Sequence, residues 1–414
     1  MDKTYILRPK YIEAIKPFIG KAVIKVFTGQ RRVGKSYIMI QIMDTIKQAD
    51  KKANIIYIDK EKYEFDFIKN YHDLVKYIAG KNKLQTKTYL FIDEIQEIQG
   101  FEKAIRDFVK SGKYDVYISG SNSELLSSDL AGKLSGRYVE TRVHGLSYEE
   151  FLLFHSGRNA RYTEHPARYK LEKGMDSLEK YIRYGGLPYL VNLKLEDEQV
   201  FGYLKNVFDT VILKDVVSRF EVRNVNFLGR LVEYLADNLG SIVSSKKISD
   251  FLKSQNINLS PNTVLNYLSF LTSSFFVTKC QRMDISGKKI FEIGEKYYFE
   301  DLGLRHSIIN FKQVDINKIL ENLVYSKLIN LGYKTYIGQI GNQEIDFVGE
   351  KAGKKIYVQV AYLISSKKVE EREFKNLLLI KDNYPKYVVS MDKMAGGNVK
   401  GITHLHILDF LTKS

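Results

Sequence analysis

The sequence contains a single cysteine, Cys280, no tryptophan, and no apolar run long enough to cross a membrane. One cysteine excludes an internal disulfide, and seven scattered histidines without companion cysteines argue against a zinc site. The first ten residues, MDKTYILRPK, lack the apolar core of a secretion signal. We therefore expect a cytoplasmic protein with no membrane partner.

The charged residues are unbalanced, because 64 Lys and Arg against 49 Asp and Glu give a net charge of +15 at pH 7. This excess favours a polyanionic partner such as nucleic acid, although genomic base composition also produces lysine-rich, tryptophan-free chains. Apolar residues make up 44% and charged residues 27%, as in globular proteins, and 414 residues are too many for one ordinary core. We expect two or three domains.

Residues 22–44 contain the most informative pattern of the chain. An apolar, β-branched run is followed by a glycine-containing stretch and then by apolar residues at helical spacing, which predicts a strand, a loop and a helix. The loop has the spacing G-x-x-x-x-G-K-S, in which backbone N–H groups surround a phosphate, the lysine reaches the outer phosphates and the serine ligates magnesium. We expect ATP and Mg²⁺ to bind here. The predicted binding residues are Gly29, Gln30, Arg31, Arg32, Val33, Gly34, Lys35, Ser36 and Tyr37, of which Lys35 is also a catalytic candidate.

A second stretch, 88–94, ends an apolar strand with the carboxylates of Asp93 and Glu94. In nucleoside triphosphatases the two acids of such a pair have different roles. Asp93 would orient the magnesium ion, and Glu94 would polarise the attacking water. Taken alone, two acids after an apolar strand are usually a solvated strand end. Their position 57 residues beyond Ser36, after one intervening strand candidate at 54–59, favours the catalytic interpretation.

Three later polar residues are further candidates. The strand 114–122 ends in Ser121 and Asn122, and parallel strands deliver such residues to the sheet edge where the γ-phosphate would lie, although an ordinary Ser/Asn turn explains them equally well. Arg137 follows a glycine-rich turn and precedes a strand at 138–143. It would contact the phosphates within the subunit or across the interface of a homo-oligomer, or else face solvent.

Several short stretches closely resemble a prokaryotic family of AAA+ ATPases. They are Gly29–Ser36, Phe91–Glu94, Ser119–Asn122, Leu146–Phe151, Tyr184–Pro188 and Leu213–Val217. The resemblance implies an α/β fold, in which a P-loop NTPase (AAA+) parallel-sheet domain over 1–157 carries a helical lid over 158–225. It also implies ATP hydrolysis and a C-terminal domain of unknown function with a nuclease-like core.

Residues 226–300 are expected to form a winged helix-turn-helix. Three amphipathic helices at 226–239, 246–253 and 260–271 are followed by two strand-like pieces, 275–282 and 289–293, that would pair as a wing. The third helix would present polar side chains to a DNA groove, and Lys288 and Lys289 would touch phosphates. Winged helices also dock proteins or serve structural roles, so DNA remains one of several partners.

Residues 301–414 are similar to the core of the PD-(D/E)xK nucleases, a restriction-endonuclease-like α/β fold. In that pattern Glu321 on a helix and Asp346 on a strand would hold magnesium. Gln359 stands where a third acid is expected and Ala361 where the catalytic lysine belongs. Lys367 or Lys368 would have to reach in from the next helix, so the simpler expectation is a degenerate, inactive domain.

These patterns leave three functional hypotheses. The leading one is an ATP-hydrolysing AAA+ protein whose C-terminal modules bind DNA or another macromolecular partner in a nucleotide-dependent way. The first alternative is a DNA nuclease gated by ATP, and the second is a signalling ATPase whose C-terminal modules dock proteins. His404 and His406 alternate along a predicted strand, where we expect them to decorate the surface.

Overall fold

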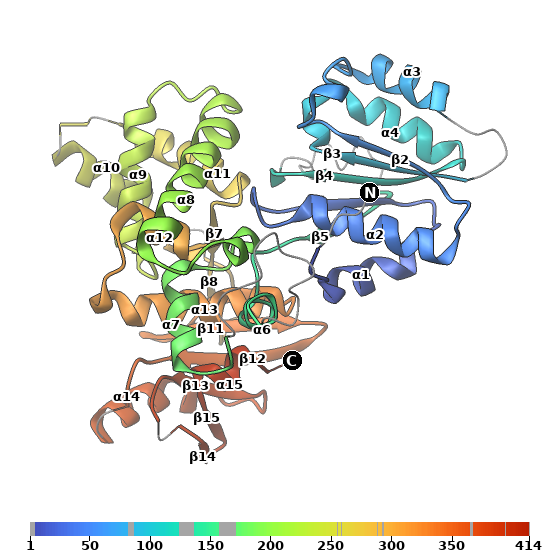
Figure 1. The fold of residues 1–414 in the computed structure, drawn as a ribbon. Coiled ribbons are helices and arrows are strands. Elements are labelled where there is room, and N and C mark those ends of the chain that lie inside the picture. The colour runs from blue at the N-terminus through green and yellow to red at the C-terminus, as the bar shows by residue number, and fades with distance from the viewer. Residues whose placement is uncertain are drawn as a thin grey trace. The chain divides into compact units, whose positions relative to one another are not determined.

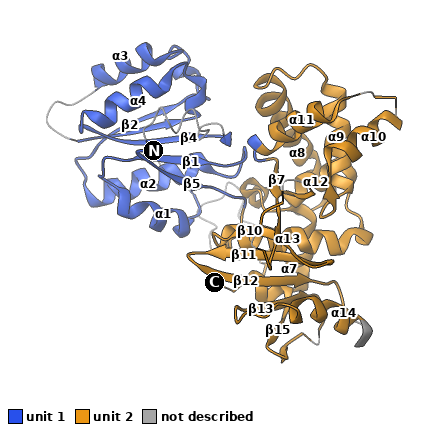
Figure 2. Cartoon of the chain, turned by 180° about the vertical axis from the view of Figure 1, so that it is seen from behind, with its two compact units in different colours: residues 1–145, 161–164, 273–275 blue, residues 146–160, 165–272, 276–414 orange. Residues whose placement is uncertain are grey.

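The structure is a computed structural model of the chain. It describes residues 5–81, 87–123, 136–156, 171–254, 256–257, 259–287, 289–291, 294–364, 367–393 and 395–413. The chain forms two compact units, of which unit 1 consists mainly of residues 1–145 and unit 2 mainly of residues 146–414 (Figure 2).

Unit 1 is built on a five-stranded sheet in the order β2-β3-β4-β1-β5, with every neighbouring pair parallel. Its strands are β1 (Ile24–Thr28), β2 (Asn54–Asp59), β3 (Thr88–Asp93), β4 (Tyr114–Gly120) and β5 (Tyr138–Arg142). Helices cover both faces, with α1 (Pro9–Ile15) and α2 (Lys35–Ala49) on one side and α3 (Tyr71–Lys81) and α4 (Phe101–Lys110) on the other (Figure 1). The predicted parallel sheet is thus confirmed.

The central strands are buried on both faces, which explains why they read as continuous apolar runs. On the side of α3 and α4, one core includes Val26, Ile92 and Ile118 from three neighbouring strands. The intervening residues point the other way, where Phe91 and Tyr117 stack with ring centroids 4.2 Å apart. Because the strands are parallel, the carboxyl ends of β1, β3 and β4 meet at one edge of the sheet.

Helix α3 begins later than the sequence pattern predicts. We expected a helix from residue 66 to 78, but a 3₁₀ turn, η2 (Tyr63–Phe65), comes first and α3 starts at Tyr71. The Asn70 side chain accepts hydrogen bonds from the backbone N–H groups of His72 (2.9 Å) and Asp73 (3.3 Å). This local capping sets the start of the helix.

Unit 2 opens with a helical region. Its elements are α6 (Tyr148–Phe154), α7 (Met175–Tyr184), the 3₁₀ helix η6 (Pro188–Asn192), α8 (Asp197–Thr210) and a π-helical continuation, η7 (Val211–Ser218). Helix α12 (Leu302–Ile309), which lies much later in the chain, packs against α7 and α8. The helical region is therefore completed by a segment from outside the predicted lid.

The next region contains three helices and a small antiparallel sheet. The helices are α9 (Val225–Asp237), α10 (Ser245–Ser254) and α11 (Pro261–Ser273), close to the predicted ranges. The sheet has the order β6-β9-β7 and is formed by β6 (Ile242–Val243), β7 (Val277–Cys280) and β9 (Glu295–Phe299). We call the whole region from α9 to β9 the three-helix module.

The pairing predicted for the wing is found only in part. Backbone hydrogen bonds from Phe291 to Arg282 (2.9 Å) and from Asp284 to Lys289 (2.8 Å) close a hairpin around the predicted turn, but β7 is not part of it. The strand that pairs with β7 is β9, which begins beyond the expected 289–293 segment. Residues 282–284 form a separate strand, β8 (Arg282–Asp284), which runs parallel to β10 in the C-terminal sheet and is bridged on its other side by Ile290. Arg282 also donates a hydrogen bond to Gln339 of β10, which anchors this hairpin to the C-terminal sheet.

The C-terminal part is a mixed seven-stranded sheet in the order β14-β15-β13-β12-β11-β10-β8. Its remaining strands are β10 (Lys334–Ile340), β11 (Gln343–Lys351), β12 (Lys354–Val360), β13 (Lys386–Ser390), β14 (Gly397–Val399) and β15 (Ile402–His406). Its helices are η8 (Gln313–Asp315), α13 (Ile316–Asn330), α14 (Lys367–Leu378) and α15 (Ile407–Leu411).

His404 and His406 do lie on one strand, β15, but His404 does not simply decorate the surface. Its Nε2 atom is 2.8 Å from the Ser390 hydroxyl, and its ring meets the Phe374 ring edge-on at 6.0 Å. Burial accordingly lowers the pKa of His404. Within the described ranges, no helix combines the length and the apolar character that a membrane span requires.

Candidate nucleotide-binding site

The loop between β1 and α2 has the backbone that a phosphate-binding loop requires. Gly29 (φ 144°), Arg32 (φ 72°) and Gly34 (φ 96°) all have positive φ, so the chain turns repeatedly before α2 begins at Lys35. A Cβ atom on Gly29 would overlap the carbonyl oxygen of Val143, so only glycine fits there. Three turns within six residues curl the loop over the N-terminus of α2, which is a favourable place for an anion.

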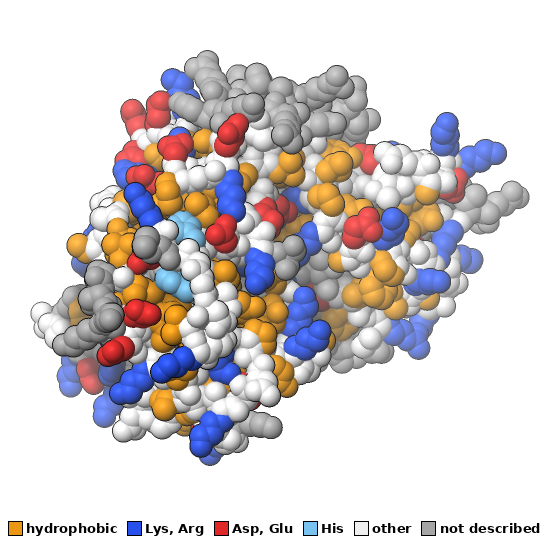
Figure 3. All heavy atoms as spheres, turned by 90° about the horizontal axis from the view of Figure 1, so that it is seen from below, with side chains coloured by type: hydrophobic (Ala, Val, Ile, Leu, Met, Phe, Trp, Pro, Cys, Tyr) orange, Lys and Arg blue, Asp and Glu red, His pale blue; other side chains and the backbone are white. Residues whose placement is uncertain are grey.

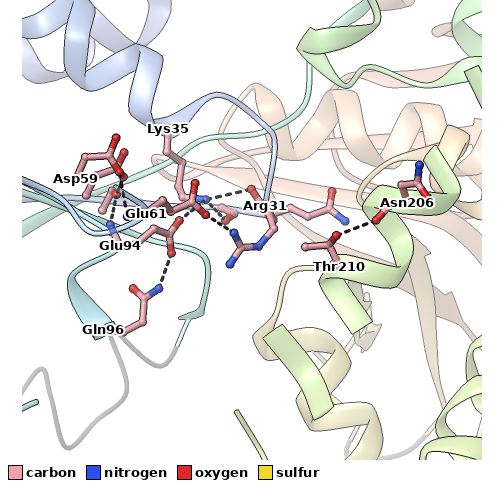
Figure 4. A network of polar contacts seen from close by, with 12 residues as sticks. Arg31, Lys35, Asp59, Glu61, Glu94, Gln96, Asn206 and Thr210 are labelled. Carbon is pink, nitrogen blue, oxygen red and sulfur yellow. Dashed lines mark hydrogen bonds and ion pairs between the residues drawn. The ribbon is translucent and has the colours of Figure 1, made fainter. Parts of the chain in front are cut away.

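Lys35 lies along the inside of this loop (Figure 4). Its side chain is 5% exposed, and its Nζ donates to the carbonyl oxygens of Gly29 (3.0 Å) and Gln30 (3.2 Å). The same Nζ is 3.8 Å from Oε1 of Glu94. A cation held between a loop and a carboxylate in this way can exchange those oxygens for phosphate oxygens.

Asp93, the last residue of β3, is a buried carboxylate in a polar environment. It accepts hydrogen bonds from the Ser119 hydroxyl on β4 and from the Tyr57 hydroxyl on β2 at 3.3 Å. Burial, followed by the charge of Glu94, raises the pKa of Asp93, while hydrogen bonds from Ser119 and Ser36 oppose the shift. The structure therefore brings Asp93 and Ser36, the two predicted metal ligands, together.

These two oxygens fit a magnesium site of the kind that a bound nucleotide completes. Asp93 carries a charge that burial disfavours, which a divalent cation would neutralise. Among the residues that the structure describes, no group of three or more His, Cys, Asp and Glu is arranged to hold a metal ion. A magnesium ion here would take its other ligands from phosphate and water, as Mg²⁺ commonly does.

Glu94 follows directly and leaves the strand in a left-handed conformation, with φ of 52°. Its backbone N–H donates to the Ser119 hydroxyl (3.2 Å), and its carboxylate accepts a hydrogen bond from the Gln96 side chain. The carboxylate is thus aimed and held beside Lys35 rather than being a solvated strand end (Figure 4). A held carboxylate next to the phosphate loop is suited to orient and deprotonate water.

The other predicted residues have less uniform positions. Ser121 and Asn122 are buried beyond the end of β4, at the same sheet edge as Asp93, whereas Tyr37 is 52% exposed on α2. Arg31 forms a 2.5 Å ion pair with Glu61 at the surface (Figure 4).

Arg137 is not brought to the loop. Its carbonyl oxygen accepts a hydrogen bond from the backbone of Ile24, the first residue of β1, whereas the phosphate loop follows Thr28 at the other end of that strand. Five strand residues span about 15 Å. A contact of Arg137 with phosphate in the same chain is therefore unsupported, and only its predicted contact across an interface remains as a hypothesis.

Ser119 is the residue that the sequence interpretation missed. We assigned the sensing role to Ser121 and Asn122, but Ser119 contacts both Asp93 and the backbone of Glu94. The registered pairs of β3 and β4 end with Ile92 opposite Ile118, which places the next residue of each strand together. Only the register of two strands, which the sequence does not display, singles out this serine.

A second acidic centre lies in unit 2, where α13, β11 and β9 meet. Three acidic residues lie there, Glu321, Glu344 and Asp346. The side chain of Lys296, on β9, lies close to all three. Lys296 Nζ is 2.8 Å from Oε1 of Glu344 and 3.4 Å from Oε2 of Glu321, to which the Tyr298 hydroxyl also donates (3.3 Å). Asp346 accepts a hydrogen bond from the backbone of β12 at 2.7 Å.

The protonation of this acidic centre is set by the opposing charges of Lys296 and its acidic neighbours. Burial disfavours the ammonium of Lys296, but the nearby carboxylates of Glu321, Asp346 and Glu344 outweigh it and raise the pKa of Lys296. Burial also raises the pKa of Glu321 and of Asp346, and Lys296 opposes both shifts. The ammonium is therefore the counter-ion of the acids.

The remaining nuclease-like positions lack the expected chemistry. Gln359 donates to Glu373 (3.4 Å), while Ala361 is 5% exposed and its backbone continues the sheet by donating to Val389. Lys367 and Lys368 begin α14, but their side chains lie outside the described part of the structure. The lysine of this centre is thus Lys296, from a strand that the sequence pattern did not connect with it.

Comparisons with known proteins extend these observations. A family model described as an AAA domain matches residues 21–152, and a domain of unknown function (DUF8612) matches residues 175–315, from α7 to η8. An uncharacterised protein of Haemophilus influenzae is 35% identical over 415 residues, covering 99% of this chain and 100% of that protein. An uncharacterised protein of Methanocaldococcus jannaschii is 29% identical over 359 residues, covering 85% and 77%.

Among solved structures, AMPPCP-bound DnaA from Aquifex aeolicus aligns at 13% identity over 65% of this chain and 89% of that one, with a TM-score of 0.32. The family is shown by the near full-length relative and by the AAA match over the phosphate loop. The chain therefore belongs to a prokaryotic family of AAA+ P-loop ATPases that carry a domain of unknown function after the AAA domain.

Proposed function

We propose that the protein binds ATP with Mg²⁺ at the loop 29–37 and hydrolyses it. The observation that supports this most directly is the assembly of Lys35, Ser36, Asp93 and Glu94 at one sheet edge. Lys35 would neutralise the outer phosphates, Ser36 and Asp93 would hold the magnesium ion, and Glu94 would take a proton from the attacking water. The ion would supply charge neutralisation on the phosphates.

Calorimetric titration with ATP and magnesium tests the binding step. Lys35→Ala removes the cation from the loop and should abolish most of the affinity, with loss of phosphate release in a turnover assay. Lys47→Ala, on the exposed end of the same helix, is the matched control and should behave as the wild type. Unchanged ATP affinity in Lys35→Ala would show that the loop does not bind the phosphates.

We further propose that unit 2 binds a macromolecular partner in a nucleotide-dependent way through the three-helix module. Its order of helices and strands is that of a winged helix, and α11 is the third helix, whose exposed side chains include Asn262, Leu265 and Asn266. Residues 261–273 contain no lysine or arginine. A helix that enters a DNA groove is usually accompanied by cations that contact phosphates.

The distribution of charge makes a protein partner the better match for this module. Residues 226–300 contain nine Lys and Arg against seven Asp and Glu, so the net charge of the chain is not concentrated there. Figure 3, which looks at unit 2 from the side of the C-terminal sheet, shows that lysine and arginine side chains are interspersed with acidic and uncharged ones on that face as well. Of the two wing lysines, Lys289 is exposed and Lys288 lies outside the described residues.

Binding to labelled duplex DNA at several salt concentrations separates the partner classes. Weak binding that changes little with salt agrees with protein docking. Tight binding that falls steeply as salt rises would instead support DNA, with about one unit of slope for each phosphate contact. Magnesium-dependent cleavage that Asp346→Ala abolishes would support the nuclease alternative, against which the salt-bridged state of Glu321 and the residues at 359 and 361 argue.

A further inference from the structure

Arg8, in the segment before α1, is a buried arginine whose partners belong to the phosphate loop and to the end of unit 1. Its side chain is 3% exposed. Nη1 donates to the carbonyl oxygen of Val33 (3.0 Å), and Nη2 donates to the carbonyl oxygens of His144 (3.1 Å) and Gly145 (3.2 Å). The guanidinium also lies over the Tyr11 ring, 4.6 Å from its centroid. Burying a guanidinium requires such partners, so its position is narrowly defined.

The contact with Val33 bears on the shape of the loop. In a trans peptide the carbonyl oxygen of one residue and the N–H of the next point in opposite directions. When Arg8 holds the Val33 oxygen, the N–H of Gly34 therefore points away from Arg8. Gly34 precedes Lys35 in the left-handed conformation, where its N–H is one of the donors that the G-x-x-x-x-G-K-S pattern offers to phosphate.

The contacts with His144 and Gly145 lie at the point where the chain leaves unit 1. The hydroxyl of Tyr11 reinforces them by accepting a hydrogen bond from the backbone N–H of His144 (3.0 Å). The next residue, Leu146, already belongs to unit 2, so no linker separates the residue that Arg8 holds from the second unit.

Leu146, which follows the Gly145–Leu146 peptide bond, is held by hydrogen bonds within unit 2. Its N–H donates to the carbonyl oxygen of Gly186 (2.7 Å), and its own carbonyl oxygen accepts from the Tyr181 hydroxyl (2.8 Å). The N–H of Gly186 donates to the Asp301 carboxylate (2.7 Å) at the start of α12. A Cβ atom on either Gly185 or Gly186 would overlap these partners, which accounts for the glycine pair.

We propose that Arg8 is a positioning residue for the phosphate loop and that it couples the state of this loop to the connection between the two units at residues 144–146. The proposal rests on ATP binding at the loop. A phosphate that pulls on the Gly34 N–H moves the Val33 carbonyl, and Arg8 transmits that displacement to His144 and Gly145. Arg8 touches no phosphate itself, because its guanidinium is occupied by backbone oxygens on the far side of the Val33–Gly34 peptide.

The test compares Arg8→Met and Arg8→Lys with the control Lys47→Met, an exposed lysine at the far end of α2. Arg8→Met should raise the KM for ATP at least about tenfold and change kcat less than about threefold, since Glu94, the proposed general base, is untouched. Arg8→Lys keeps one donor nitrogen and should recover part of the affinity. Lys47→Met should match the wild type.

Amide hydrogen exchange supplies the second readout. In the wild type, a non-hydrolysable ATP analogue should slow exchange at residues 143–147, and in the Arg8 variants saturated with the same analogue this protection should be lost. A purely structural role would lower thermal stability without this selective loss. If Arg8→Met does not fold, Arg8→Lys decides the question by the same two measurements.

Two outcomes overturn the proposal, and they are distinguishable. A folded Arg8 variant with wild-type KM and wild-type protection at 143–147 refutes the role of Arg8 while leaving ATP binding intact. A wild-type protein that does not bind ATP refutes the proposed function and this inference together.

Discussion

Glu94→Gln separates nucleotide binding from hydrolysis most cleanly. The amide keeps the size of the carboxylate and can still accept the hydrogen bond from Gln96, so the end of β3 should keep its conformation. It cannot take a proton from water. A positioned general base is worth about 10²- to 10⁴-fold in rate. We expect kcat to fall at least about a hundredfold, which corresponds to about 3 kcal/mol in the barrier.

The same change should not weaken ATP binding. Two unit charges about 4 Å apart interact by about 4 kcal/mol at an effective dielectric constant of 20, and Lys35 Nζ lies 3.8 Å from the Glu94 carboxylate. The substitution releases Lys35 from this competing partner and removes a negative charge beside the incoming phosphates. The affinity of Glu94→Gln for ATP should therefore equal or exceed that of the wild type.

The assay combines calorimetric ATP titration with measurement of phosphate release under saturating ATP and magnesium. Glu97→Gln is the matched control, because Glu97 is exposed three residues later and undergoes the same chemical change. It should hydrolyse ATP at the wild-type rate. If Glu94→Gln turns over within about threefold of the wild type, another group activates the water and the assignment of Glu94 is wrong.

Two further predictions concern the stability of unit 2. Lys296→Met leaves the acids of the second centre without their counter-ion and should lower the free energy of unfolding by about 3–5 kcal/mol at pH 8. The loss should shrink at pH 5, where the carboxyl groups, whose pKa values burial already raises, take up protons. Urea unfolding with the exposed-site control Lys354→Met measures it, and an equal loss at both pH values would contradict the charge argument. Burial raises the pKa of Asp301 to about 6, above its ordinary value of 3.8, so the native state keeps a proton that the unfolded state loses. The free energy of unfolding should therefore fall by up to about 3 kcal/mol as the pH rises from 4 to 6. Asp301→Asn should flatten this slope, and an unchanged slope would show that Asp301 does not titrate in that range.

The nucleotide site was predictable because its signals are local. The change from a β-branched run to glycine turns and then to helical spacing lies within about twenty residues, and Asp93 and Glu94 directly follow their own apolar strand. Parallel strands then bring both segments to one sheet edge without further information. The same rule argues against a phosphate contact of Arg137 within the chain, because Arg137 precedes β5 and the amino end of a parallel strand lies at the opposite edge of the sheet.

The residues that were missed act over long distances in the sequence. Lys296 is 25 positions from Glu321, and its strand, β9, belongs to the three-stranded sheet, whereas Glu344 and Asp346 lie on β11 of the seven-stranded sheet. Arg8 is 25 positions from Val33 and 136 from His144. Neither stands in a motif, and a single basic residue near a helix start is most often solvated. The partner of β7 in the wing was mispredicted for a related reason, because alternation identifies a strand but does not choose its partner.

Lys296 also gives the C-terminal sheet a role that does not require catalysis. Its ammonium comes from β9 of the three-helix module, and its carboxylate partners lie on α13 and β11 of the C-terminal part. The ion pair between Lys296 and Glu321 thus joins the two parts of unit 2. Separating the two parts would leave each of these charges without its partner, which is costly for groups that are largely buried. In the proposed coupling, a displacement that enters unit 2 at Leu146 would then move the three-helix module and the seven-stranded sheet together, and the sheet would serve as a rigid support for the module that we propose binds the partner.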